Sequence, residues 1–229
     1  MKRIVKMVFE GIADLWYKAV YLFLSTGVIK LYQPVFGRME KADSATRNCL
    51  DRWTVIGPML GNDNGSVLDI GCNLGFFSFK AAESGRLAIG VDHNHFNIHF
   101  CRAISYVNRV DGSVFVNKNL DLDTLRNLPK FDVIFNFSVF HHWVKSYNSE
   151  TAQDMMRVLA KKCDRMFFET GQPNETGAKW AEKLHFMGSR PDVWIETFLR
   201  DIGFNDVRMI GTFPTGLTNV KRHLFIASK

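Results

Sequence analysis

The chain has 229 residues, enough for one α/β domain with a full hydrophobic core. Its net charge of +6 at pH 7 favours an anionic substrate or an acidic surface such as a membrane face, although proteins that bind neither often carry such an excess. The four cysteines form no C-x-x-C pair and fit no zinc pattern, which excludes a zinc module and predicts reduced thiols in a cytoplasmic protein.

The amino-terminal segment, residues 1–42, is predicted to form a helical extension or lid, and residues 43–229 the main domain. The apolar part of residues 15–32 is too short to cross a bilayer. One interpretation is an amphipathic helix that lies on the inner face of a membrane or covers the site. The other is a helix that packs into the core, which we expect because aromatic residues at helical spacing usually face a core.

Strands and helices alternate through the main domain. Asp43 is a candidate N-cap for a helix that runs to about Met59, and residues 61–65 form a turn. Alternation of strand and helix implies parallel strands joined by right-handed crossovers. The expected strands are 66–70, 88–92, 113–117, 131–136 and 165–170, with helices at 75–84, 94–107 and 148–162 between them.

The carboxyl-terminal part is expected to differ from this alternation. A helix at 191–202 precedes strands at 206–212 and 222–228, which a short loop joins and which must therefore be antiparallel. The predicted fold is α/β, with a mostly parallel seven-stranded sheet, a terminal antiparallel strand and helices on both faces. The loop 213–221 is expected at the carboxyl edge of the sheet, beside the ligand crevice.

Two acid-ended strands are the most informative pattern. A buried strand carries Asp69 and leads into a glycine turn, and the next strand ends at Asp92. Gly71 permits the sharp turn, and Gly75 lets the following helix approach the strand and the ligand. Acids at the carboxyl ends of adjacent parallel strands face the crevice in which such sheets bind ligands. Asp92 is therefore expected to accept hydrogen bonds from two ribose hydroxyls.

A dinucleotide site is the main rival. That fingerprint requires G-x-G-x-x-G, but Asn73 stands where the middle glycine would be, and the spacing from Gly71 to Gly75 is one residue short. Asp69 would also repel a pyrophosphate and would favour a cationic ligand. S-adenosylmethionine carries a sulfonium and an ammonium, so we predict that it is the cofactor. An ordinary strand–turn–helix with incidental acids is the remaining alternative.

Histidines follow the fourth strand at the edge where an acceptor should arrive. His141 and His142 are the candidate catalytic residues, and one of them would act as a base for a hydroxyl or steady an anionic acceptor. The alternative is that both are structural. Glu169 closes the fifth strand and is a further candidate to face the acceptor.

Two other polar groups have competing interpretations. Lys221, Arg222 and His223 follow the last loop and would bind an anionic acceptor there, but we expect a solvated edge strand, where lysine also discourages aggregation. His95 and His99 are four residues apart with no carboxylate at a matching spacing, so we expect no metal.

With these motifs the chain resembles the class I S-adenosylmethionine-dependent methyltransferases, which have a Rossmann-like fold. The resemblance is closer to the methyltransferase domain of bacterial O-antigen chain-terminating kinase–methyltransferases, and it runs from about residue 30 to the carboxyl terminus. We expect no kinase activity. The shared features are Asp69-Ile70-Gly71-Cys72, Gly75-Phe76-Phe77-Ser78, Ser138-Val139-Phe140-His141-His142, Tyr32-Gln33, Phe36-Gly37, Arg47, Cys49 and Arg52.

The resemblance implies a set of cofactor-binding residues. Arg52 would pair with the cofactor carboxylate, although without the resemblance it would be interpreted as a solvated helix charge. Asn73 in the glycine turn and His93 after the second acid complete the set. The resemblance implies that Tyr32, Gln33 and Arg52 enclose the cofactor, Gly71 and Phe137 contact its methionine end, Asp92 its ribose, and Leu120 and Asp121 the adenine edge.

The expected function is O-methylation of a glycan, a glycolipid or a glycan-linked phosphate in polysaccharide synthesis. The expected partner is a small-molecule or glycan acceptor, with no DNA. A looser similarity to tRNA wobble-uridine methyltransferase-like enzymes, around Pro191–Met209, keeps RNA methylation as an alternative. A cofactor-binding module without catalysis and an NAD-dependent dehydrogenase are the others.

Overall fold

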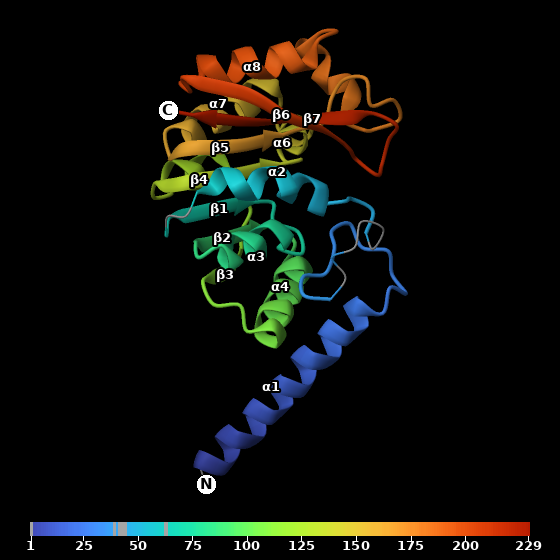
Figure 1. Ribbon diagram of the computed structural model, residues 1–229, viewed down its shortest axis with the longest axis vertical. Helices are drawn as coiled ribbons and strands as arrows, with labels where there is room; N and C mark the ends of the chain where they lie inside the picture. Colours follow the sequence, from blue (N-terminus) through green and yellow to red (C-terminus); the bar gives the residue numbers. More distant parts are fainter. Residues whose placement is uncertain (1, 39, 41–44, 62–63) are drawn as a thin grey trace.

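The computed structural model describes residues 2–38, 40, 45–61 and 64–229, with the backbone alone for residues 2–10. Seven strands form one sheet in the order β3-β2-β1-β4-β5-β7-β6 (Figure 1). The first five pair in parallel, and β7 is antiparallel to both β5 and β6. The strands are β1 Ser66–Ile70, β2 Leu87–Asp92, β3 Ser113–Asn117, β4 Phe131–Phe137, β5 Cys163–Glu169, β6 Asp206–Pro214 and β7 Lys221–Ser228.

Helices cover both faces of the sheet, as the sequence predicts. None of them, within the part of the chain that the structure describes, is long and apolar enough to span a bilayer. The helices are α1 Lys2–Ser25, α2 Leu50–Leu60, α3 Phe76–Glu83, α4 His95–Asn108, α5 Leu122–Arg126, α6 Phe140–Ser146, α7 Ser149–Ala160 and α8 Pro191–Asp201, with a 3-10 helix, η1, at Ala181–Met187.

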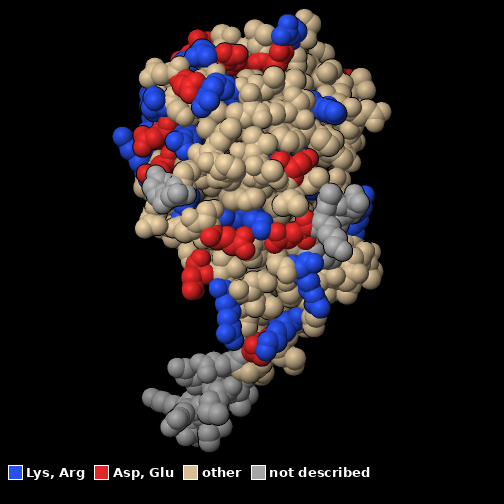
Figure 2. Space-filling view, viewed as in Figure 1, with Lys and Arg blue, Asp and Glu red and all other residues tan. Residues whose placement is uncertain are grey.

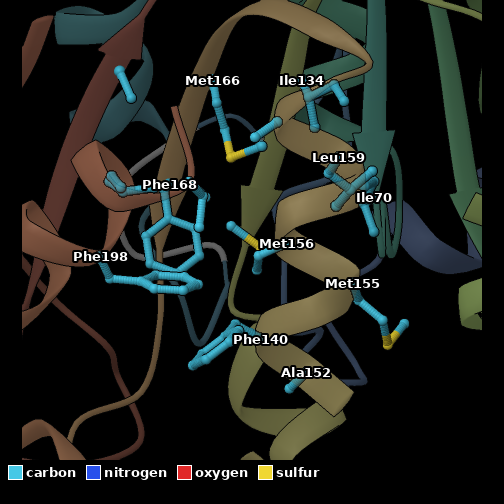
Figure 3. Packing of buried hydrophobic residues seen from close by; sticks show 14 of the residues in the cluster. Ile70, Ile134, Phe140, Ala152, Met155, Met156, Leu159, Met166, Phe168 and Phe198 are labelled. Carbon is cyan, nitrogen blue, oxygen red and sulfur yellow. The ribbon is translucent and has the colours of Figure 1, made fainter. Parts of the chain in front are cut away.

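The hydrophobic core has a layer on each side of the sheet. On one side, Ile134 of β4 and Met166 and Phe168 of β5 face Met156 and Leu159 of α7 (Figure 3). Successive residues of a strand point to opposite faces, so the neighbouring residues of the same strands fill the other layer. That second layer contains Val67, Val133, Phe135 and Phe167, with Ile56 of α2 and Phe77 of α3.

The predicted fold class is confirmed, and the central parallel strands match their expected ranges to within two residues. One expectation about the last strand is wrong. β7 lies between β5 and β6 and is therefore an inner strand, so Arg222 is buried instead of lying on a solvated edge. A short loop fixes the antiparallel pairing of the last two strands, but which of them joins the parallel sheet is decided by packing.

Several helical segments differ from the sequence predictions. The expected N-cap Asp43 lies outside the described residues, and the helix that was expected after it begins only at Leu50. There the Asn48 side chain accepts hydrogen bonds from the amides of Leu50 and Asp51, at 3.1 and 3.4 Å. The short helices α5, α6 and η1 were not predicted, because five to seven residues carry too little periodicity to be recognised.

Over residues 11–25, whose side chains the structure describes, helix α1 packs through one face, so the expectation of a core-packing helix is wrong for the opposite face. Tyr21 and Leu24 are buried, and the Tyr21 hydroxyl donates to the carbonyl of Phe36 over 3.2 Å. The rings of Tyr17 and Tyr106 lie 5.0 Å apart, which joins α1 to α4. Figure 1 shows the helix extending beyond α4, away from the sheet.

Candidate active site

A cavity of about 560 Å³ opens at the carboxyl ends of β1, β2 and β4. The sheet reverses its order between β1 and β4, and doubly wound sheets bind ligands at such a switch point. Leu217 of the loop 213–221 lines the cavity, so this loop lies beside the crevice as expected. The predicted site residues that line it are Tyr32, Gln33, Gly71, Asn73, Asp92, His93, Phe137, His141 and His142, whereas Arg52, Asp69, Gly75, Leu120 and Asp121 do not.

The glycine turn forms the floor of the cavity. Gly71 has φ +68°, and a Cβ there would meet Val139 at 2.6 Å, so only glycine fits without a shift. Asn73 also has positive φ, at 53°, a conformation that asparagine tolerates. Gly75 has φ +77° and lies against the ring of Phe115. Gly75 therefore allows helix–strand packing behind the cavity and does not line it.

Asp92 presents a fixed carboxylate to the cavity. Its Oδ2 accepts from the backbone N–H of Asn73 over 2.9 Å, and its Oδ1 accepts from the N–H of Asn94 over 2.8 Å. Each carboxylate oxygen has lone pairs left for further donors. The two amides hold the side chain in a single orientation, which suits the binding of two adjacent hydroxyls.

Asp69 lies behind the turn instead of facing the cavity. Its Oδ2 accepts from the Ser78 hydroxyl over 2.6 Å, and the side chain is buried. Burial raises the pKa of Asp69 to about 7, even though the bond from Ser78 acts in the opposite direction. The sequence pattern paired Asp69 with Asp92 at the ligand, but strand alternation turns Asp69 into the layer between the sheet and α3.

Arg52 is held by protein groups on every side. Its Nε donates to Glu169 Oε2 over 2.7 Å, and its Nη atoms donate to the carbonyls of Asn48 and Pro214. The residue is completely buried, so its interpretation as a solvated helix charge is wrong. Instead of lining the cavity, Arg52 supports Glu169, which in turn binds Arg47.

Leu120 and Asp121 are not part of the cavity wall. Leu120 is buried in the main hydrophobic cluster. Asp121 caps α5, because its Oδ1 accepts from the N–H of Thr124 over 2.8 Å. The preceding residue, Asn119, does line the cavity. The structure thus brings this segment to the site through a residue next to the predicted pair.

Two buried arginines meet at Ser138. Its Oγ accepts from Arg47 Nη1 over 3.0 Å and from Arg222 Nη1 over 2.9 Å. Arg47 also donates to Glu169 over 2.7 Å, and Arg222 donates through Nε and Nη2 to Glu175, at 2.7 Å each. We call Arg47, Ser138 and Arg222 the arginine centre. All three line the cavity.

The charges around the arginine centre are paired. Arg47 pairs with Glu169, Arg52 with Glu169 and also with Asp51 at 3.3 Å, and Arg222 with Glu175. Burial would raise the pKa of Glu169, but the charges of Arg47 and Arg52 outweigh it and hold that pKa below its ordinary value. Because Nη1 of Arg47 and Nη1 of Arg222 converge on Ser138 in the cavity wall, two cationic side chains lie beside any ligand there, which favours an anionic or strongly polar one.

Buried polar atoms that lack partners lie around the cavity. Within the described chain, Arg47 Nε, Asn73 Oδ1 and Trp180 Nε1 have no hydrogen-bond partner, and all three residues line the cavity. Buried polar groups are nearly always paired in folded proteins. Two donors and one acceptor therefore remain for a ligand that is itself polar.

The two histidines have different surroundings. His141 is buried, and its Nδ1 accepts from the N–H of Gly171 over 2.9 Å, which assigns its hydrogen to Nε2. Burial and the charge of Arg222 hold the pKa of His141 well below its ordinary value. His142 is exposed toward the cavity, and burial of part of its ring, together with Lys145, lowers its pKa as well. Both shifts favour the neutral form of the ring at pH 7.

Several lining residues were missed as site residues by the sequence analysis. Arg47 and Arg222 were noted in the sequence, but not that both would donate to the same serine, Ser138. Ser138 has positive φ, at 63°, which no local pattern reveals. Trp180 comes from the long segment between β5 and η1, where the sequence has no motif; its ring lies under the Arg222 guanidinium at 5.6 Å.

The chain belongs to the methyltransferase domain family. The family model for a methyltransferase domain matches residues 61–184, more than half of the chain. Fold and family together define a class I methyltransferase, whose methyl donor is S-adenosylmethionine. The matched part contains the glycine turn, the Asp92 strand end and the His141–His142 segment.

Among particular proteins, the chain is similar to the O-antigen chain terminator bifunctional methyltransferase/kinase WbdD of Escherichia coli, with 29% identity over 206 residues. This match covers 87% of the chain and 28% of that relative. A solved structure of WbdD superposes with a TM-score of 0.75 at 27% identity, covering 91% of this chain and 46% of that one. A tRNA U34 carboxymethyltransferase of Pseudomonas fluorescens is 26% identical over 178 residues, which is 72% of this chain and 54% of the relative.

Proposed function

We propose that the protein transfers a methyl group from S-adenosylmethionine to an oxygen of a glycan, a glycolipid or a glycan-linked phosphate in cell-envelope polysaccharide synthesis. The similarity to WbdD, named as an O-antigen chain terminator, supports the acceptor class. The single observation that carries the proposal is the arginine centre, in which two buried cationic side chains meet in the cavity wall.

The cavity fits the cofactor. Asp92 offers oxygens to the ribose hydroxyls, and Asn73 Oδ1 is an unpaired acceptor in the same wall. Tyr32, Gln33 and Phe137 would enclose the methionine end, with Gly71 leaving room for it. Bound S-adenosylmethionine supplies a methyl group that is activated by a sulfonium. The task of the protein is then alignment, which by itself is worth several kcal/mol in such reactions.

The arginine centre would orient the acceptor. Arg47 Nε and Trp180 Nε1 are donors without partners, and they point to an acceptor with anionic or strongly polar oxygens. A phosphate oxygen is already ionised and needs no base. For a hydroxyl acceptor, neutral His142, which lines the cavity, is the better base. The lone pair on Nδ1 of His141 already accepts a hydrogen bond from the N–H of Gly171, so it is not free to take a proton from the acceptor.

The first test is transfer of labelled methyl from S-adenosylmethionine to fractionated lipopolysaccharide, lipid and RNA. We expect label in the glycan-containing fractions, and phosphatase pretreatment will show whether a phosphate is required. Label in RNA alone, or in no fraction, would contradict the proposal.

The second test separates acceptor binding from cofactor binding. Arg222→Met combined with Glu175→Gln removes one of the two arginines of the centre together with its carboxylate partner, so no unpaired charge is left buried. We expect the acceptor KM to rise by about tenfold or more, as for loss of a charge-assisted hydrogen bond, with little change in affinity for S-adenosylhomocysteine. Arg200→Met with Glu196→Gln, an exposed pair on α8, is the matched control. If the variant changed the affinity for S-adenosylhomocysteine and left the acceptor KM unchanged, the arginine centre would bind the cofactor instead of the acceptor.

RNA methylation is the second candidate, because the tRNA U34 carboxymethyltransferase relative covers 72% of the chain. Binding to RNA would require a continuous basic surface. On the face shown in Figure 2, Lys and Arg side chains alternate with Asp and Glu. Steeply salt-dependent binding of tRNA would favour this candidate over a glycan acceptor.

A further inference from the structure

Helix α1 carries a row of large apolar side chains on its solvent side. Ile12, Leu15, Trp16, Leu22 and Phe23 are 52–70% exposed. We call these five residues the α1 stripe. At 100° per residue they occupy one face of the helix, about 120° wide, with no charged residue among them. An apolar face of this size is unusual for the surface of a folded monomer.

The opposite face of α1 is the one attached to the protein. Asp14 accepts from the Tyr106 hydroxyl over 3.2 Å, and Tyr21 and Leu24 are buried against the body. This attachment fixes which side of the helix faces outward. Since α1 extends beyond α4 (Figure 1), the body of the protein leaves the stripe uncovered.

Basic residues accompany the stripe. Residues 1–30 contain five Lys or Arg and two Asp or Glu, a net charge of +3, which is half of the +6 of the whole chain. Figure 2 shows Lys and Arg side chains, with an acidic side chain beside one of them, where the helix leaves the body. An apolar stripe with tryptophan and phenylalanine in a basic segment matches the chemistry of an anionic bilayer interface.

A second copy of the chain fits the stripe less well. In heptad terms Ile12, Leu15 and Leu22 would form the seam, but Trp16 and Phe23 would then flank it on one side. Those flanking positions normally carry charges of opposite sign that pair between helices. Here the only charged flanking residue in the described part of α1 is Lys18, which is bonded to Asp14 of its own helix at 2.8 Å.

We propose that the α1 stripe docks on the surface of an anionic lipid bilayer, with the helix lying in the interface. The helix ends at Ser25, a short distance before Tyr32 and Gln33 in the cavity wall. Docking would therefore hold the cavity close to the membrane surface, where a lipid-linked acceptor is concentrated. The proposal rests on the stripe and not on the identity of the acceptor.

The test is co-sedimentation of the full chain with vesicles of phosphatidylcholine, with and without phosphatidylglycerol. We expect binding to the phosphatidylglycerol vesicles and a loss of about tenfold or more in the variant Leu15→Glu with Phe23→Glu. Both residues are exposed, so the fold is kept, and thermal unfolding checks this. The matched control is Val193→Glu with Met209→Glu, which alters two apolar residues of similar exposure elsewhere.

Three other outcomes would overturn the proposal. Unchanged binding of the stripe variant would show that the stripe is not the docking surface. Equal binding to pure phosphatidylcholine would remove the anionic requirement. Self-association in sedimentation equilibrium that the stripe variant abolishes, without vesicle binding, would assign the stripe to a second copy. Vesicle binding without methyl transfer would leave this proposal standing while the proposed function failed.

Discussion

The backbone N–H of Asn73 donates to Oδ2 of Asp92 over 2.9 Å. This bond joins the turn after β1 to the end of β2, so the two strand ends that the sequence pattern singled out are physically coupled. The carboxylate that is expected to bind ribose is held by the same loop that leaves room for the methionine end. A change at Asp92 therefore affects both the ligand contact and the shape of the turn.

Replacing Asp92 by asparagine should weaken cofactor binding. An amide nitrogen in place of one oxygen would face the N–H of Asn73 or of Asn94, and a charge-assisted acceptor would be lost. We expect S-adenosylhomocysteine affinity to fall by about tenfold or more in calorimetry, which corresponds to roughly 1.5–3 kcal/mol. Asp123→Asn, in an exposed ion pair, is the control. Equal affinity in the Asp92 variant would remove the ribose assignment.

Asp69 should make the protein less stable as the pH rises. Burial raises the pKa of Asp69 to about 7 from 3.8, so between these values the folded protein keeps a proton that the unfolded chain has released. Stability from this group is complete below about pH 4 and decreases up to about pH 7. The expected loss is on the order of 2–4 kcal/mol.

The measurement is urea unfolding at several pH values. Asp69→Asn should flatten the decline between pH 4 and 7, whereas Asp111→Asn, at an exposed position, should leave it unchanged. The same slope in the wild type and in Asp69→Asn would show that another group causes the decline.

Replacing Glu169 by glutamine should strongly destabilise the protein. Glu169 accepts from Arg47 and Arg52 at 2.7 Å each and is fully buried, so its neutralisation leaves Arg47 without an anionic partner and Arg52 with only Asp51, at 3.3 Å. The expected cost is about 3–5 kcal/mol in the free energy of unfolding. Glu196→Gln, in the exposed pair with Arg200, should cost less than about 1 kcal/mol. Comparable costs for the two variants would mean that the buried network contributes little.

His142 should control the acid side of the pH–rate profile if the acceptor is a hydroxyl. Burial and Lys145 lower the pKa of His142 from its ordinary value of 6.5, which favours the neutral base at pH 7. Activity should therefore fall only when the pH drops through the lowered pKa of His142. His142→Gln should remove this limb and reduce kcat by about 100-fold or more. With a phosphate acceptor the same variant should leave kcat nearly unchanged, so steady-state kinetics of His142→Gln distinguishes the two acceptor chemistries.

The local sequence pattern was sufficient to predict the central strands and the glycine turn. Apolar runs that end at Asp69 and Asp92 predict two buried parallel strands, and their carboxyl ends must share an edge of the sheet. The same reasoning placed the loop 213–221 beside the cavity, where Leu217 lies. These features depend on residues close together in sequence, so periodicity and turn chemistry reveal them.

The sequence by itself determined the fold class, the crevice and the place of Asp92 in it, because strand period and glycine turns are local properties of the chain. Only the tertiary structure decided that Asp69 and Arg52 turn away from the cavity, and that Arg47 and Arg222 meet at Ser138. It also decided which face of α1 is left to solvent. These outcomes depend on which distant side chain neutralises or covers each group, and that is settled by packing across the whole molecule.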